Sequence, residues 1–164
     1  MCLIALSVEK ASDWNGKDSY FFNVIANRDE YHARQTTKMH WWPNKTILAG
    51  RDEEAGGTWL GTNRDGKFAA ITNLKEQSKI KYKSSRGALV TDFLESQQSA
   101  KVYLEQIEPI KEQYAGFNLI VGDKDGLFYL CNRLEGIYFI SEGTHALGNL
   151  TLNSSTKKVD SIKS

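Results

Sequence analysis

Residues 2–8 constrain the fold most, because every residue in this stretch except Ser7 is apolar. A strand with one face in water alternates apolar and polar side chains, whereas a strand covered on both faces reads as a continuous apolar run. The stretch therefore predicts a central strand with other layers of structure on both sides. Asn15-Gly16 follows, a dipeptide typical of tight hairpin turns, so residues 20–26 are expected to return as an antiparallel partner.

The rest of the chain predicts more short strands and two helices. Apolar runs bounded by turn residues favour strands at 46–49, 58–61, 67–72, 117–121, 127–131, 137–140 and 145–150. Apolar residues recur at helical spacing only in the middle of the chain, from Leu89 to Leu94 after the candidate N-cap Ser85, and again over 102–110. This order predicts an α+β fold in which helices cover antiparallel sheets.

Composition excludes several classes of protein. With 21 Lys and Arg against 20 Asp and Glu, the net charge is +1, which supplies no basic surface for nucleic acid. No apolar stretch approaches the ~18–20 residues that span a bilayer. Two cysteines, Cys2 and Cys131, do not make a disulfide framework. We expect a cytoplasmic protein with no nucleic-acid partner and no transmembrane segment.

The length of 164 residues predicts a single domain, placed at residues 1–152 and followed by a polar tail at 153–164. The tail reads NSSTKKVDSIKS, with neither a capped helix nor a closing apolar strand. It is therefore expected to be a disordered end, or the point where a longer protein has been truncated.

Cys2 is the sharpest candidate for chemistry. Methionine aminopeptidases act on small second residues, so removal of Met1 would leave a cysteine with a free α-amine. An α-amine has a pKa of about 8, so it can serve as the general base for its own thiol. The alternative is a small buried residue that merely begins the first strand, since free cysteines are commonly buried.

Arg28 and Asp29 directly follow the returning strand. A guanidinium near Cys2 would lower the pKa of its thiol, and a carboxylate could hold the α-ammonium. Asn73 ends a third strand, and the start of one antiparallel strand lies beside the end of the next. Cys2, Arg28 and Asn73 are therefore expected to converge at one margin of a sheet. The alternative is that Arg28 pairs with Asp29 or Glu30 in solvent, and that Asn73 closes a turn.

Other motifs predict no metal and no resident cofactor. The three histidines, His32, His40 and His145, lack the spacing of metal ligands. Asp123-Lys124-Asp125-Gly126 lacks the remaining ligands of a calcium loop, so it predicts a hairpin turn. Gly56-Gly57 is followed by neither Lys-Ser/Thr nor a helix, which favours a tight turn over a phosphate-binding loop.

Seven short motifs occur in the order of a known family. They are Met1-Cys2-Leu3-Ile4, Ala26-Asn27-Arg28-Asp29-Glu30, Ala49-Gly50-Arg51-Asp52, Gly56-Gly57-Thr58-Trp59-Leu60-Gly61, Ile71-Thr72-Asn73, Ser85-Arg86-Gly87 and Gly116-Phe117-Asn118-Leu119. Together they make the chain similar, as far as Asn149, to the NRDE family, also called the transport and Golgi organisation protein 2 family. The resemblance implies an N-terminal-nucleophile (Ntn) hydrolase-like αββα sandwich of antiparallel sheets. Family members run considerably further, so it also implies an incomplete C-terminal part.

The resemblance implies a role for each matching residue. Cys2 takes the place of the nucleophile, Arg28 that of its electrostatic partner, and Asp29 that of the group that orients the α-amine. Asn73 matches an asparagine that donates to the oxyanion. Asn149 matches a later asparagine near the nucleophile.

Trp59 and Arg86 stand in two other motifs and are candidate substrate-binding residues. The wider superfamily includes choloylglycine hydrolases and acyltransferases, so the resemblance implies a cysteine amidohydrolase or acyltransferase for a small, partly apolar substrate or other acyl-type ligand. The alternative is a non-enzymatic protein that binds or traffics haem or lipid in the same cleft. Haem would take an axial ligand such as Cys2, Cys131 or a histidine. For a eukaryotic chain, the family adds a Golgi or mitochondrial association.

Overall fold

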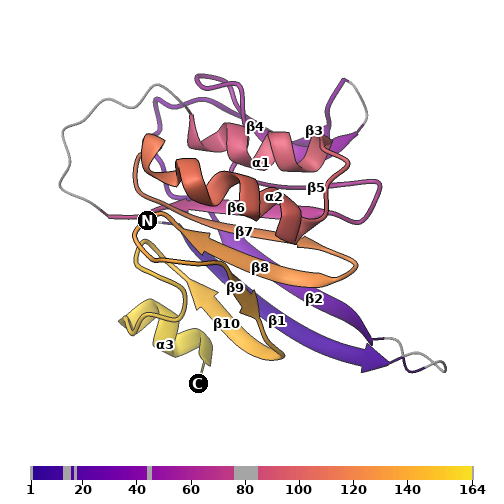
Figure 1. Ribbon diagram of the computed structural model, residues 1–164. Coiled ribbons are helices and arrows are strands. Elements are labelled where there is room, and N and C mark those ends of the chain that lie inside the picture. The colour runs from indigo at the N-terminus through magenta and orange to yellow at the C-terminus, as the bar shows by residue number, and fades with distance from the viewer. Residues whose placement is uncertain (1, 13–15, 17, 44–45, 76–84, 164) are drawn as a thin grey trace.

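The computed structural model describes residues 2–12, 16, 18–43, 46–75 and 85–163, and within them the chain forms two stacked antiparallel sheets with helices outside each (Figure 1). One sheet has the order β10 (Gly143–Leu147), β1 (Leu3–Ser12) and β2 (Asp18–Asn27). The other runs in chain order through β3 (Thr36–Trp41), β4 (Ile47–Asp52), β5 (Leu60–Asn63), β6 (Phe68–Asn73), β7 (Phe117–Asp123), β8 (Gly126–Cys131) and β9 (Tyr138–Ile140). The helices are α1 (Arg86–Glu95), α2 (Ala100–Ile107), which continues into a 3-10 helix (Glu108–Gln113), and α3 (Lys157–Lys163).

β1 is the middle strand of the smaller sheet, as its continuous apolar sequence predicted. It pairs with β2 in antiparallel register, with Leu3 opposite Asn27, and with β10 along its other edge. Ile4, Leu6 and Val8 lie in the interface between the two sheets, where each is at most 3% exposed. The apolar run at the N-terminus therefore supplies one side of the core between the sheets.

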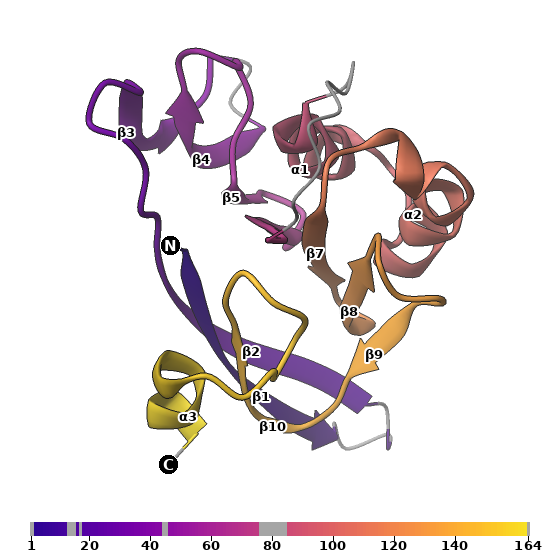
Figure 2. The ribbon, with the colours of Figure 1, turned by 90° about the vertical axis from the view of Figure 1, so that its left-hand side faces the viewer.

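The larger sheet lies between the smaller sheet and the two longer helices (Figure 2). Its middle strands β6 and β7 are buried along nearly their whole length. One face packs against α1 and α2 through side chains such as Phe93 and Leu104, and the other packs against β1. α3 lies against β10 and β1 on the outer side of the smaller sheet. The layers follow the order helix, sheet, sheet, helix, which confirms the predicted αββα sandwich.

Two elements differ from the expectation. β3 was not predicted, because its residues are exposed except for the half-buried His40 and show no alternation. α3 falls within the stretch expected to be a polar tail, and its Val159 is buried beside β10. One buried apolar residue in so short a helix leaves too little periodicity to predict it. Asn15 of the predicted hairpin turn lies outside the described residues, whereas Gly16 has φ +75°, the left-handed conformation that such a turn requires.

Leu6→Ala tests the core between the sheets. Leu6 is 1% exposed, so its truncation removes buried apolar surface and leaves a cavity. We expect the free energy of unfolding to fall by about 2–5 kcal/mol, measured by urea denaturation. Ser7→Ala, on the opposite face of the same strand, is the matched control and should change this free energy by less than about 0.5 kcal/mol. A loss below about 1 kcal/mol for Leu6→Ala would contradict the layered packing.

Candidate functional site

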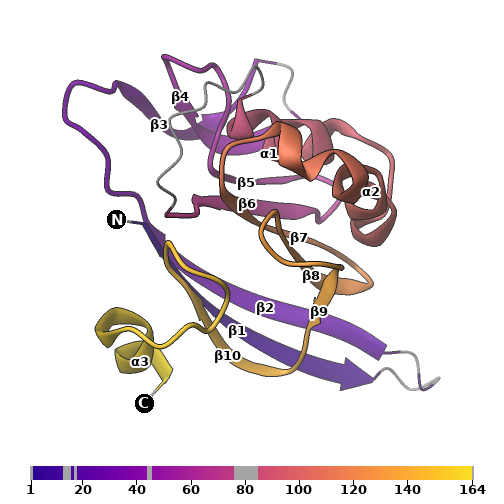
Figure 3. The same cartoon turned by 60° about the vertical axis from the view of Figure 1, so that its left-hand side comes forward.

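Cys2 and Arg28 lie at the same end of the smaller sheet. Cys2 directly precedes β1, Arg28 directly follows β2, and the register places Leu3 opposite Asn27. The two residues are therefore cross-strand neighbours at the margin visible in Figure 3, where the N-terminus lies beside the end of β2. Cys2 is half-buried and forms no disulfide.

Asn73 and Asn149 reach this margin from other elements. Asn73 ends β6 of the larger sheet, and Asn149 lies in the segment 148–152 after β10. The Asn149 side-chain amide donates to the Asn73 carbonyl oxygen at 2.7 Å. The Lys75 backbone N–H donates to the Asn149 carbonyl oxygen at 2.9 Å. These bonds tie the segment after β10 to the end of β6, and so join the two sheets here.

A cavity of about 490 Å³ opens between these strand ends and the start of α1. All seven residues that the sequence singled out line it: Cys2, Arg28, Asp29, Trp59, Asn73, Arg86 and Asn149. Further lining comes from residues to which the sequence assigned no role, including Arg34, Asp52, Ala55 and Ile71. The structure thus brings the candidates together around one cavity, while the role of each stays a prediction.

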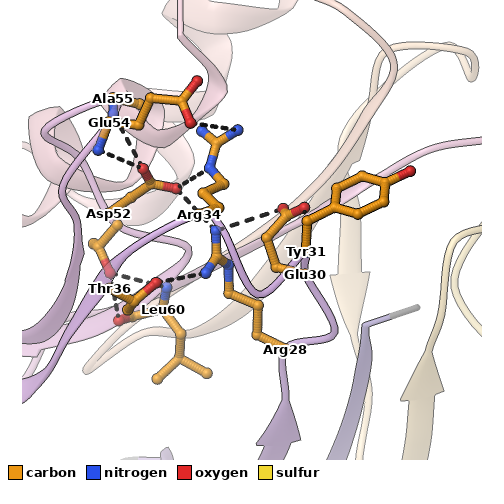
Figure 4. A network of polar contacts seen from close by, with 10 residues as sticks. Arg28, Glu30, Tyr31, Arg34, Thr36, Asp52, Glu54, Ala55 and Leu60 are labelled. Carbon is orange, nitrogen blue, oxygen red and sulfur yellow. Dashed lines mark hydrogen bonds and ion pairs between the residues drawn. The ribbon is translucent and has the colours of Figure 1, made fainter.

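Asp52, which sequence reasoning missed, is the centre of a polar network at this cavity (Figure 4). Its Oδ2 accepts from Arg28 Nη2 at 2.9 Å and from Arg34 Nε at 2.7 Å. Its Oδ1 accepts from the backbone N–H groups of Glu54 and Ala55 at 3.1 and 3.0 Å. Burial alone raises the pKa of Asp52, but the hydrogen bonds from Arg34 and Ala55 and the positive charges nearby outweigh burial. The pKa of this carboxyl therefore lies below its ordinary value.

Arg28 is held on several sides. Besides its bond to Asp52, Nη1 donates to Thr36 Oγ1 at 2.7 Å, and the guanidinium lies over the Trp59 ring at 4.6 Å from its centroid. Nη2 is also 3.5 Å from Glu30 Oε2. The pairing with Glu30 that was considered as an alternative is therefore present, but the Arg28 side chain is only 14% exposed and also pairs with Asp52. Asp52 and Glu30 therefore compensate much of the positive charge that Arg28 brings to the cavity.

Asp29 lines the cavity next to Arg28, and its role toward the Cys2 α-amine stays a prediction. The pKa of the Asp29 carboxyl is below its ordinary value, first because the amino terminus of the chain donates a hydrogen bond to it. Asn27 Nδ2 also donates to Asp29 Oδ1 at 2.8 Å. The amino group that lowers this pKa belongs to Met1 and not to Cys2, so it does not test the predicted role of Asp29.

α1 begins at the cavity, and two contacts fix it there. A Cβ on Gly57 would lie 3.0 Å from the Gly87 carbonyl carbon, so glycine permits the close approach of the loop between β4 and β5 to the helix. Arg86 Nη1 donates to the Gly116 carbonyl oxygen at 2.8 Å, which joins the first turn of α1 to the residue before β7. Arg86 therefore supports the cavity wall as well as lining it.

The described residues offer no cluster of three or more His, Cys, Asp or Glu that could hold a metal ion. In the same part of the chain, no helix is both long and apolar enough to cross a membrane.

Comparisons with known proteins place this arrangement in a family. The sequence profile of the family described as transport and Golgi organisation 2 matches residues 1–164. The Transport and Golgi organization 2 homolog of Mus musculus is 35% identical over 153 residues, which is 87% of this chain and 55% of the relative. The Transport and Golgi organization protein 2 homolog of Homo sapiens matches with the same identity and coverage. The chain thus spans about half the length of the curated relatives it matches.

Among solved structures, the fold is similar to that of a Caenorhabditis elegans N-acylethanolamine-hydrolyzing acid amidase ortholog. The TM-score is 0.57 at 12% identity, over 96% of this chain and 73% of that chain. At this level of identity the likeness concerns the fold alone, and it agrees with the Ntn-hydrolase-like architecture that the sequence predicted.

Asp52→Asn tests the polar network. The substitution keeps an acceptor but removes the charge shared by Arg28 and Arg34, and we expect the free energy of unfolding at pH 7 to fall by about 2–4 kcal/mol. Because the pKa of Asp52 is lowered by folding, its contribution is present above about pH 4. That contribution is lost as the pH falls through the folded-state pKa, so the gap between wild type and variant should narrow in acid.

Urea unfolding at several pH values between neutrality and acid measures both effects. The matched control is Glu54→Gln, since Glu54 is 70% exposed and lies 3.9 Å from Arg34. This exposed pair should contribute less than about 0.5 kcal/mol. A gap between wild type and Asp52→Asn that stays constant down to the lowest pH would contradict the assignment of the lowered pKa to Asp52.

Proposed function

Because the chain belongs to the transport and Golgi organisation 2 family and has an Ntn-hydrolase-like fold, we propose that its cavity is the active site of a cysteine amidohydrolase or acyltransferase. The observation that carries the proposal is the convergence of all seven candidate residues on one cavity beside Cys2. These residues lie just before β1, just after β2, in β6, in α1 and in two loops, so proximity in sequence does not account for it. Trp59, Ile71, Ala55 and Ala115 add apolar surface, which suits a small, partly apolar substrate.

The proposed reaction begins at Cys2 once Met1 has been removed. The free α-amine accepts the thiol proton, and the thiolate Sγ attacks the carbonyl carbon of the substrate amide. The resulting oxyanion accepts hydrogen bonds from the side-chain amides of Asn73 and Asn149. An amide nitrogen carries two hydrogens, and the bond to the Asn73 carbonyl oxygen uses one of those on Asn149. The second hydrogen is the one proposed to meet the oxyanion.

Collapse of this intermediate breaks the carbon–nitrogen bond. The α-ammonium returns its proton to the departing nitrogen, an amine leaves, and a thioester remains on Cys2. A water molecule, deprotonated by the same α-amine, then releases the acid and restores the thiol; an amine or alcohol in place of water gives acyl transfer. Asp29, which lines the cavity together with Cys2, is proposed to hold the ammonium form during the cycle.

The proposal predicts that turnover depends on Cys2 and on a free amine at that residue. We expect Cys2→Ala to abolish release of p-nitroaniline from butyryl p-nitroanilide, used as a probe amide. Adding two residues ahead of Cys2 should lower the rate about 100-fold or more, because it removes the general base. Intact mass should show loss of Met1 and, after a short reaction, a butyryl adduct on the wild-type chain.

Cys131→Ala is the matched control. Cys131 is the last residue of β8, is fully buried, and is not among the described lining of the cavity. It should keep the wild-type rate in the probe assay. Retained Met1, or full activity in Cys2→Ala, would refute the mechanism. Saturable binding of the probe without turnover by the processed wild type would assign the cavity to a ligand-binding protein instead.

A further inference from the structure

The segment 148–152, which follows β10 at the cavity, is held from within by a buried polar group centred on Asn118. Asn118 lies in β7 and is fully buried. Its side-chain nitrogen donates to the Leu150 carbonyl oxygen at 2.9 Å and to Thr72 Oγ1 at 3.2 Å. Its side-chain oxygen accepts from the Tyr129 hydroxyl at 2.7 Å. Each polar atom of this side chain therefore has a partner.

Thr72 and Tyr129 extend the same support to both ends of the segment. The Thr72 hydroxyl donates to the Gly148 carbonyl oxygen at 2.8 Å, and the Leu152 N–H donates to the Tyr129 hydroxyl at 3.2 Å. Thr72 lies opposite Asn118 in the register of β6 and β7, and Tyr129 stands on the next strand, β8. Three adjacent strands thus bind the segment at every second residue.

Asn149 lies between two of these anchored residues. The carbonyl oxygens of Gly148 and Leu150 accept hydrogen bonds from the side chains of Thr72 and Asn118. Asn149 itself is hydrogen-bonded to the backbone of Asn73 and Lys75. The residue is therefore held on both sides along the chain and at its own amide and carbonyl. Asn118 takes no part in the described lining of the cavity, so it affects chemistry there through its partners: Leu150 of this segment, and Thr72, which adjoins Asn73.

We infer that Asn118 is a positioning residue for the reaction proposed above, on which this inference rests: it sets the place of the Asn149 amide. A group that stabilises a developing charge has to be held within about 0.5 Å of its productive position. A displacement of about 1 Å, caused by a change far from the chemistry, can lower the rate about 100-fold. The Asn118 side-chain nitrogen donates to the Leu150 carbonyl oxygen and the Thr72 hydroxyl, and its side-chain oxygen accepts from the Tyr129 hydroxyl. The nitrogen and the oxygen of this amide therefore cannot exchange places.

A purely structural role for Asn118 gives a different expectation, and Asn63 provides the comparison. Asn63 ends β5, at the opposite end of the larger sheet from Asn73, and is 8% exposed. Its side-chain amide donates to the Leu94 carbonyl oxygen at 2.8 Å, and its oxygen accepts from the Lys67 N–H at 3.0 Å. Asn63→Ala removes another buried, hydrogen-bonded amide without touching the segment 148–152.

The experiment compares Asn118→Ala and Asn118→Asp with Asn63→Ala in the hydrolysis of butyryl p-nitroanilide. The aspartate keeps the shape and the acceptor but presents an oxygen where the Leu150 carbonyl requires a donor. We expect each Asn118 variant to lower kcat about 10- to 100-fold, with KM within about twofold of wild type. Asn63→Ala should keep the wild-type kcat. Alkylation of Cys2 by iodoacetamide should keep its rate in every variant, because Asn118 acts on Asn149 and not on the thiol.

Amide hydrogen exchange provides a readout that does not depend on turnover. The Lys75 N–H reports on the Asn149 carbonyl oxygen, so its protection should fall in both Asn118 variants and persist in Asn63→Ala. If the wild type hydrolyses no probe, the proposed function fails, while the exchange still decides whether Asn118 places Asn149. Tyr129→Phe removes only the phenol bonds to Asn118 and Leu152, and it replaces Asn118→Ala if that variant does not fold.

Two results would overturn the inference. One is wild-type kcat together with wild-type Lys75 protection in the Asn118 variants. The other is a loss of kcat and of Lys75 protection in Asn63→Ala as large as in the Asn118 variants, which would show a general effect of removing a buried amide. Loss of Lys75 protection confined to the Asn118 variants, with the fall in kcat and an unchanged KM, supports it.

Discussion

The packing of the two sheets against each other decides where every other part of the molecule lies. Ile4, Leu6 and Val8 of β1 meet Phe68 and Ile120 of the larger sheet in a core that excludes water. β6 and β7 are buried on both faces, and β1 is buried on the face toward them, so burial fixes the position of each strand and, with it, its end. The cavity is built on those ends, and its geometry therefore depends on an apolar core that contains none of its polar residues.

The polar residues at this margin form two groups. Arg28, Arg34 and Asp52 make a charged network whose members hold one another, and it attaches the chain after β2 to the turn after β4. Asn73 and Asn149 contribute neutral amides, and their hydrogen bond joins the end of β6 to the segment after β10. Both groups of residues therefore hold loops in place at the cavity, one through charges and the other through neutral hydrogen bonds.

The sequence could predict what depends on local pattern. β1 was recognisable from its unbroken apolar run, and Cys2, Arg28 and Asn73 from reactive groups at strand ends. Asp52 was missed because a charged turn looks the same in sequence whether it faces water or, as here, an arginine 24 residues away. Asn118 left a usable signal, since a polar residue inside the apolar run 117–121 indicates a buried polar network. Its partners come from strands and loops whose pairing no local pattern reveals.

The pairing of β1 with β10 means that the cavity can form only late in the synthesis of the chain. Of the residues that line the cavity, Cys2 is synthesised first. At about 5–20 residues per second, it precedes Asn149 by roughly 7–30 s. Until β10 and the segment after it are made, β1 lacks one of its neighbours and the cavity lacks Asn149. Contacts between residues so far apart in the chain also form late and slowly. Cys2 is thus made well before Asn149, and the cavity is complete only once the segment after β10 has been synthesised and has joined the end of β6.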